Sequence, residues 1–155
     1  MKKVSTQQAL SRLQKICSIQ EKCSSDLIRK LKSWDLSEEE ILKIIDSLKK
    51  DKFLDDNRFA IYFVREKFKI NKWGRGKINF ALKKKEIDAE IRESALREIN
   101  EENSIEILKD LLIRKKKGIK SSGLYELKGK LIRFGTQRGF SFEIVYKVVE
   151  EILKV

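Results

Sequence analysis

The sequence predicts an all-α protein built as a tandem array of three three-helix repeats, elongated and curved. Two features of composition support this fold class. The 155-residue chain has no proline and only seven glycines, whereas sandwiches and barrels need many turns. Apolar residues make up 41% of the chain, which is enough for a folded core. A third observation, a motif that occurs three times, predicts the repeats.

The recurring motif is a Leu, a spacer, a large apolar residue, then Ser or Asp, any residue, and Glu. It comprises Leu31 with residues 36–39, Leu82 with residues 87–90, and Leu131 with residues 140–143, where four extra residues precede the Phe. Ser37, Asp88 and Ser141 are suited to cap helix N-termini, because their side-chain oxygens can accept from first-turn amides. These caps lie 51 and 53 residues apart. The spacing predicts repeats over residues 1–54, 55–103 and 104–155.

Each repeat is expected to hold three helices and to stack on its neighbours. The expected helices span roughly 5–19, 25–33 and 37–50, then 56–71, 75–85 and 88–101, then 104–117, 122–135 and 141–154. The expected core residues are Leu31, Phe59, Phe63, Ile78, Leu82, Ile87 and Leu131. Gly129 falls inside a helix, where glycine costs up to about 1 kcal/mol against alanine, and a neighbouring backbone close to it would explain the residue. A repeat of this size has a marginal core alone, so stacking would bury the remaining apolar faces.

The residue inventory excludes several classes of site. The chain has no histidine, so a Ser-His-Asp triad, a Cys-His pair and a His-bearing zinc site cannot be built. Gly118 and Gly123 have the spacing of a phosphate loop, but Leu124 stands where its lysine should be. Asp55 and Asp56 could serve a metal-dependent nuclease, although helix N-capping explains them better. We predict no catalytic residue, no metal ligand and no cofactor.

The sequence also bears on location and assembly. Its apolar runs are far shorter than the ~20 residues of a membrane-spanning helix, and the N-terminal residues lack a signal-peptide core. Cys17 and Cys23 form no disulfide framework, and we interpret Cys17 as a core residue, with a redox pair as the alternative. We expect a cytoplasmic monomer that does not associate with membranes.

Positive charge is concentrated on particular helices. The net charge is +12, and residues 58–85 contain ten basic residues and one acidic residue. At about 100° per residue, the helix from Asp56 places its basic residues on one strip and Phe59, Phe63 and Ile70 on another. The predicted binding residues are Arg58, Arg65, Lys69, Lys72, Lys77, Lys84, Lys115, Lys116, Lys130 and Arg133. A solvated surface explains any single lysine, whereas the cluster favours a polyanion, either DNA or an acidic protein surface.

Two segments of the middle repeat resemble the RecX family of bacterial recombinase regulators. The first is Phe53-Leu54-Asp55-Asp56-Asn57-Arg58-Phe59-Ala60, continuing to Phe63-Val64-Arg65. The second is Trp73-Gly74-Arg75-Gly76-Lys77-Ile78, continuing to Leu82 and Lys85-Glu86-Ile87. Arg75 stands where the family typically has a proline. The similarity is strongest over residues 27–90, and the three-unit helical layout also fits the family.

The resemblance implies a function that the repeat pattern alone does not reveal. It implies a non-enzymatic regulator that binds the RecA recombinase filament, lodges in the filament groove, and inhibits strand exchange and ATP hydrolysis. Single- and double-stranded DNA would be weaker partners on their own. Two alternatives remain at this point: a stand-alone DNA-binding protein with one helix in the major groove, and a repeat scaffold indifferent to nucleic acid.

Overall fold

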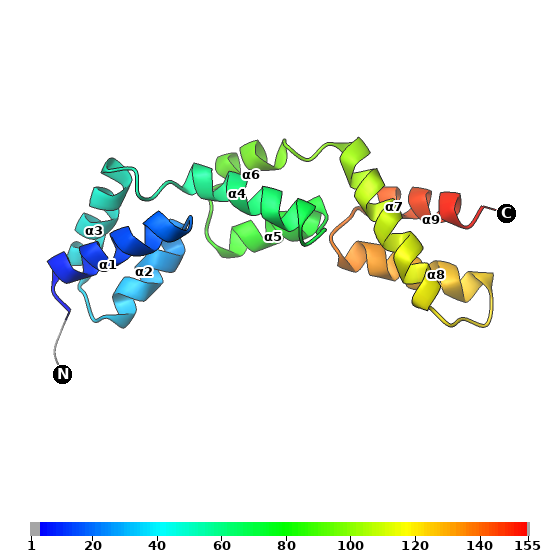
Figure 1. The fold of residues 1–155 in the computed structure, drawn as a ribbon, viewed down its shortest axis with the longest axis horizontal. Coiled ribbons are helices and arrows are strands. Elements are labelled where there is room, and N and C mark those ends of the chain that lie inside the picture. The colour runs from blue at the N-terminus through cyan, green and yellow to red at the C-terminus, as the bar shows by residue number, and fades with distance from the viewer. Residues whose placement is uncertain (1–3, 155) are drawn as a thin grey trace. The chain divides into compact units, whose positions relative to one another are not determined.

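The computed structural model describes residues 4–154, which form nine α-helices and no β-strand (Figure 1). The helices are α1 (Thr6–Ile19), α2 (Ser24–Ser33), α3 (Glu38–Lys50), α4 (Asp56–Lys69), α5 (Arg75–Lys84), α6 (Ala89–Leu96), α7 (Glu101–Gly118), α8 (Leu124–Gln137) and α9 (Phe142–Ile152). The predicted all-α repeat fold is confirmed. Within the described residues, every helix is too short or too polar to cross a membrane.

One type of turn occurs three times, between α2 and α3, between α5 and α6, and between α8 and α9. Asp35, Glu86 and Gly139 have left-handed φ angles of 57°, 58° and 100°. The next residue, Leu36, Ile87 or Phe140, is buried in each case. Its amide donates to the carbonyl five residues earlier, over 3.5, 3.2 and 3.3 Å, as is typical of helices that end in a left-handed residue. The sequence repeat is therefore also a repeat of backbone conformation.

The four extra residues of the third motif become one more turn of helix. Helices α2 and α5 have 10 residues each, whereas α8 has 14. Five residues before the buried apolar residue, α8 has Gly135 where α2 and α5 have Leu31 and Leu82. A Cβ atom at Gly135 would lie 2.8 Å from Cγ1 of Val145. Helix α9 thus approaches too closely for a side chain there, and Leu131 is buried one turn earlier.

Local hydrogen bonds begin several helices where the sequence predicts. The Ser37 and Ser141 hydroxyls accept from the amides of Glu40 and Ile144, at 3.2 and 3.3 Å. Oδ1 of Asp55 accepts from the amides of Asn57 and Arg58, at 2.9 and 3.2 Å, at the start of α4. These bonds confirm the capping roles of the two serines and of Asp55.

The expected boundary between α6 and α7 is wrong. Helix α6 ends at Leu96 instead of near residue 101, and α7 begins at Glu101 instead of residue 104. The side chain of Asn100 accepts from the Asn103 amide at 2.7 Å and caps α7. Ile99, which falls within the expected helix over residues 88–101, is buried in the segment that connects α6 to α7. An asparagine followed by two glutamates is the signal for this start.

The chain divides into two compact units, one of which combines residues 1–63 with 82–92. Helices α1 and α2 both pack on α3 there. The Asp56 carboxylate accepts from the amide and hydroxyl of Ser24, at 2.8 and 2.9 Å. The Ser25 hydroxyl donates to the Lys85 carbonyl at 2.6 Å, and the Lys85 amine donates to Asp26 at 2.8 Å. The first turn of α2 thereby binds the start of α4 and the residue after α5.

The other unit combines residues 64–81 with 93–155, and in it α7, α8 and α9 pack against one another (Figure 1). The loop before α5 also meets the loop before α9. The Gly74 amide donates to the Arg138 carbonyl at 2.7 Å, and the Gly76 amide donates to the Gly139 carbonyl at 3.0 Å. The Arg138 guanidinium donates to the Asn71 carbonyl at 2.7 Å. We call this set of contacts the glycine contact.

Close approach, and not the φ angle alone, requires glycine at position 139. Asp35 and Glu86 adopt the same left-handed conformation with full side chains. A Cβ atom at Gly139 would lie 2.4 Å from that of Lys77, and one at Gly74 would lie 2.3 Å from the Gly139 carbonyl carbon. The backbones touch only because both Cβ atoms are missing.

Most of the expected core residues are buried. Only Phe63 among them is partly exposed, and the other six are shielded from solvent. Gly129 differs from the expectation, because nothing lies within 4 Å of a Cβ atom built there. The predicted repeat boundaries at residues 54 and 103 stay a prediction.

Replacing Gly74 with Ala should destabilise the protein by about 1–3 kcal/mol, because the new methyl group collides with backbone that cannot rotate away. Gly129→Ala is the matched control and should stabilise it by about 0.5–1 kcal/mol, since the methyl group meets open space in a helix. Urea unfolding followed by circular dichroism measures both. Equal effects of the two substitutions would contradict the glycine contact.

Candidate polyanion-binding surface

The basic strip predicted on α4 is shorter in the structure than in the sequence analysis. Helix α4 ends at Lys69, and Lys72 lies beyond it with a φ of 57°. Lys72 therefore does not follow the helical spacing that placed it beside Arg65. The apolar stripe is also displaced, because Ile70 is 76% exposed whereas Val64 and Phe68 are buried.

Two arginines of this strip are already paired with carboxylates. Arg58 forms an ion pair with Glu21 and donates to the Lys52 carbonyl at 3.1 Å. Arg65 donates two bonds of 2.7 Å to the Glu98 carboxylate. These bonds raise the pKa of Arg65 and lower the pKa of Glu98. Each carboxylate offsets the positive charge that an anion would meet at its arginine, although guanidinium N–H groups remain outside these bonds.

Helix α5 carries both predicted lysines, in different surroundings. The Lys77 amine lies 4.5 Å from the centroid of the Trp73 ring, a cation–π contact. Lys84 is exposed at the end of the helix, and Ile78 and Leu82 face inward as expected. Phe80 is 59% exposed.

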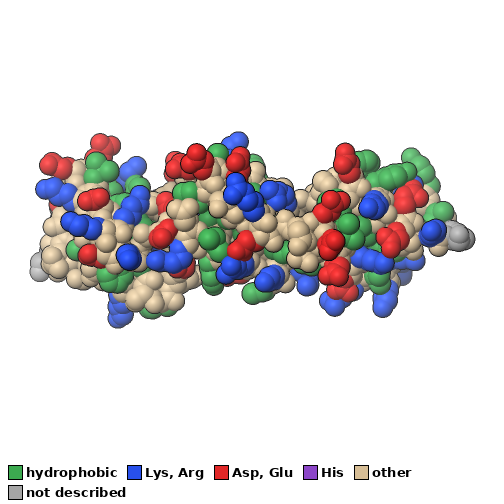
Figure 2. Space-filling view, turned by 90° about the horizontal axis from the view of Figure 1, so that it is seen from above, with side chains coloured by type: hydrophobic (Ala, Val, Ile, Leu, Met, Phe, Trp, Pro, Cys, Tyr) green, Lys and Arg blue, Asp and Glu red, His purple; other side chains and the backbone are tan. Residues whose placement is uncertain are grey.

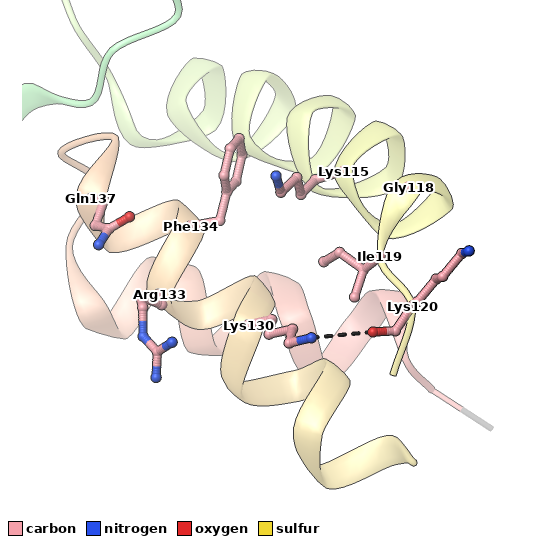
Figure 3. Close-up of a pocket in the computed structure, with 8 residues that line it drawn as sticks. All are labelled: Lys115, Gly118, Ile119, Lys120, Lys130, Arg133, Phe134 and Gln137. Atoms are coloured by element: carbon pink, nitrogen blue, oxygen red, sulfur yellow. Dashed lines mark hydrogen bonds between the residues drawn. The ribbon is translucent and has the colours of Figure 1, made fainter. Parts of the chain in front are cut away.

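Four basic residues line a hollow between α7 and α8. The hollow, of about 390 Å³, is lined by Lys115, Gly118, Ile119, Lys120, Lys130, Arg133, Phe134 and Gln137. Figure 3 shows Lys115 of α7 and Ile119 on the side of α8, whereas Lys120 directs its carbonyl toward Lys130 and its amine away, and Arg133 extends away from α7. We call this the basic hollow. Lys116 is exposed on α7 but does not line it.

Not all of this charge is available to a ligand. The Lys130 amine pairs with Glu126 at 3.0 Å and donates to the Lys120 carbonyl at 3.2 Å (Figure 3). Bonds from the Ser122 hydroxyl and then from Lys130 lower the pKa of Glu126 to about 2. Glu126 therefore remains ionised at neutral pH and offsets the charge of Lys130.

Three other cations of the basic hollow pair with no carboxylate of the described residues. Among residues 4–154, no ion pair involves Lys115, Lys120 or Arg133. The Lys115 amine lies 5.1 Å from the centroid of the Phe134 ring. Cations at a helix C-terminus also interact favourably with the helix dipole, which is a purely structural role for Lys115. Arg133 is exposed and extends into solvent, as a charged side chain normally does.

Charge is unevenly distributed over this part of the molecule. Figure 2 shows Lys and Arg side chains along one edge of the C-terminal part and acidic side chains across the face in view. The described residues contain no group of three or more Cys, Asp or Glu side chains that could hold a metal ion. The arrangement suits electrostatic contact with a chain of anionic groups.

The predicted binding residues include Lys115, Lys130 and Arg133 of the basic hollow but not Lys120. Phe134 and Gln137 line the basic hollow and were not predicted as site residues. Their signal was modest: each lies three or four residues from a predicted cation of α8, on the same side of the helix. The spacing of Glu126 and Lys130 is the i, i+4 pattern of a helical ion pair, and it could have been found.

Two parts of the chain match descriptions of one protein family. Residues 55–96 match "RecX, second three-helix domain", and residues 101–149 match "RecX, third three-helix domain". A regulatory protein RecX of Clostridium botulinum (strain Alaska E43 / Type E3) is 35% identical over 79% of this chain and 57% of its own length. One from Acinetobacter baylyi is 31% identical over 83% of this chain and 77% of its own. The chain spans less than two thirds of the length of its clostridial relatives.

Two solved structures resemble the fold. The "Crystal structure of regulatory protein RecX" has a TM-score of 0.85 and 27% identity, over 94% of this chain and 71% of the other. The structure of RecX from Lactobacillus salivarius has a TM-score of 0.83 and 23% identity, over 97% of both chains. At that identity the second likeness concerns the fold alone.

Removing the carboxylate of Glu126 should strengthen binding of a polyanion. The Glu126→Gln variant leaves the Lys130 amine without its carboxylate, so Lys130 can contact one more phosphate of a short DNA duplex. The slope of log K against log salt concentration should then become more negative by up to ~0.9, the value for one contact. Fluorescence anisotropy over a salt series measures this slope. Glu39→Gln, which makes the same change of net charge on α3, should leave the slope nearly unchanged. Identical effects of the two variants would mean that only net charge matters.

Proposed function

The chain belongs to the RecX family, and we propose that it binds RecA–DNA filaments and inhibits strand exchange and ATP hydrolysis by the recombinase. Its relatives are named regulatory proteins. The observation that carries the proposal is the basic hollow, where Lys115, Lys120 and Arg133 lack carboxylate partners within the described residues. It lies in the part of the chain that matches the third three-helix domain.

The chemistry of the basic hollow is suited to a partner that carries DNA of any sequence. Contacts to phosphate fix register and orientation without reading bases. A regulator of recombination must act on many sequences, so phosphate contacts suffice for its DNA side. The protein side of the filament would supply the specificity that distinguishes it from bare DNA.

The cations of α4 and α5 have a secondary role in this proposal. Arg58 and Arg65 would attract the filament less strongly, because Glu21 and Glu98 offset their charges. Lys69, Lys72, Lys77 and Lys84, together with Lys116, would add long-range attraction, which does not require direct contact. In this proposal the protein acts as a cytoplasmic monomer, without a cofactor, a metal ion or a membrane.

A stand-alone DNA-binding protein is the alternative. The same unpaired cations favour it, because phosphates of bare DNA would satisfy them equally well. Its binding would fall steeply with salt, and it would affect RecA only by competing for the strand.

RecA ATPase activity on single-stranded DNA distinguishes the two functions. A filament regulator should inhibit hydrolysis when it is present in amounts well below RecA, because each bound molecule acts on a filament and not on one site. A DNA competitor should inhibit only when it covers the strand. Inhibition that scales with strand coverage and with affinity for bare DNA would overturn the proposal.

Charge reversal identifies the surface involved. Lys115→Glu with Arg133→Glu should weaken inhibition by roughly tenfold or more, because these two cations have no carboxylate partner among the described residues. Arg65→Glu with Lys69→Glu makes the same change of net charge and should weaken inhibition less. The concentration for half-maximal inhibition of the ATPase measures the effect of each double variant. A larger effect of the Arg65 and Lys69 variant would indicate that the contact is on α4 and not at the basic hollow.

A further inference from the structure

A second hollow lies beside the basic hollow on α8. It has a volume of about 480 Å³ and is lined by Tyr125, Glu126, Lys128, Gly129, Lys130, Ile132 and Arg133. Lys130 and Arg133 line both hollows. The two therefore form one continuous surface, which can hold successive parts of the same ligand.

The second hollow contains an aromatic ring that the protein does not cover. Tyr125 is 93% exposed. The residue four positions later on a helix lies on the same face, and its side chain leans back toward the earlier one. That residue is Gly129, and nothing lies within 4 Å of a Cβ atom built there. The absent side chain leaves the space beside Tyr125 open.

Packing does not account for Gly129. At Gly74, Gly135 and Gly139, a Cβ atom would lie within 3 Å of other atoms of the protein. At Gly129 there is no such neighbour, although glycine is a poor helix former. The chain thus keeps an unfavourable residue in mid-helix, and its visible effect is the hollow itself.

The charges around this hollow differ in their availability. Lys128 pairs with Glu150 and lies 4.6 Å from the centroid of the Tyr146 ring. Lys130 pairs with Glu126. Arg133 has no ion-pair partner among residues 4–154. The hollow therefore presents an open aromatic ring, the partly buried side chain of Ile132 and one available guanidinium.

This combination fits a ligand with a flat π-face and a neighbouring anion. An unpaired nucleotide has both, and stacking of bases on aromatic side chains is the common mode of single-strand binding. Bases of a duplex are already stacked on one another and do not present a free face. An acidic peptide would supply the anion, but it would not need an open ring at Tyr125.

We propose that Tyr125 stacks on an unpaired base of single-stranded DNA in the second hollow, beside Gly129. Arg133 then binds a flanking phosphate, and the basic hollow binds the phosphates that follow it along the strand. The inference deepens the proposed function and rests on it, because that function requires this part of the chain to bind DNA. Its test needs no recombinase, so the two can fail separately.

The test compares three labelled ligands with equal numbers of phosphates: oligo-dT, the same backbone with abasic sites, and a hairpin duplex. Fluorescence anisotropy gives the affinity of the full chain for each. Tyr125→Ala should weaken binding of oligo-dT by roughly 5- to 150-fold and leave binding of the other two unchanged. Tyr125→Phe keeps the ring and should bind like the unaltered protein. Phe142→Ala removes another exposed ring, on α9, and should have no effect.

Filling the hollow provides an independent test. Gly129→Gln should raise the melting temperature, because glutamine is the better helix former, and should still weaken binding of oligo-dT. Equal losses of all three ligands in Tyr125→Ala, or unchanged binding of oligo-dT, would overturn the stacking site. If the unaltered chain binds none of the three ligands, both the stacking site and the premise that this part of the chain binds DNA are overturned. Loss of RecA inhibition in Tyr125→Ala with intact binding of oligo-dT would show that this face docks protein, which also overturns the inference.

Discussion

A left-handed residue after the second helix is the constraint on which each repeat depends. For Asp35 and Glu86, which are not glycine, this conformation costs roughly 1–2 kcal/mol. The turn places the next residue, Leu36 or Ile87, in the core, and burial of such a side chain contributes about 1.5–3 kcal/mol. The hydrogen bond back to the helix adds to that gain. The core, and not intrinsic backbone preference, therefore holds the conformation in place.

The third turn uses the same conformation for a further purpose. Because Gly139 has no Cβ atom, the segment before α5 can come close enough for the amides of Gly74 and Gly76 to donate to the carbonyls of Arg138 and Gly139. The glycine contact belongs to the same compact unit as Lys69, Lys77 and the basic hollow. A turn that elsewhere only closes a repeat thus also joins two segments that carry predicted binding residues.

Local interactions explain what the sequence could predict, and long-range ones explain what it could not. Ser37 and Ser141 contact residues three positions away, so their role as caps is visible in the sequence. The pair of Arg65 and Glu98 joins residues 33 positions apart, and no periodic pattern reveals it. Lys72 was misplaced because α4 ends three residues before it. The cationic helices were predictable, but the available cations were not.

Net charge and contact chemistry answer different questions about a binding surface. All 36 basic residues contribute to the long-range field that attracts a polyanion, whether or not they form ion pairs. Close contact depends on local charge, and a cation paired with Glu21, Glu98 or Glu126 attracts an anion less because its carboxylate partner offsets its charge. The field also does not distinguish single strands from duplexes. A ring that stacks only on an unpaired base makes that distinction, which is why the uncharged residues Tyr125 and Gly129 would determine selectivity on a surface rich in charge.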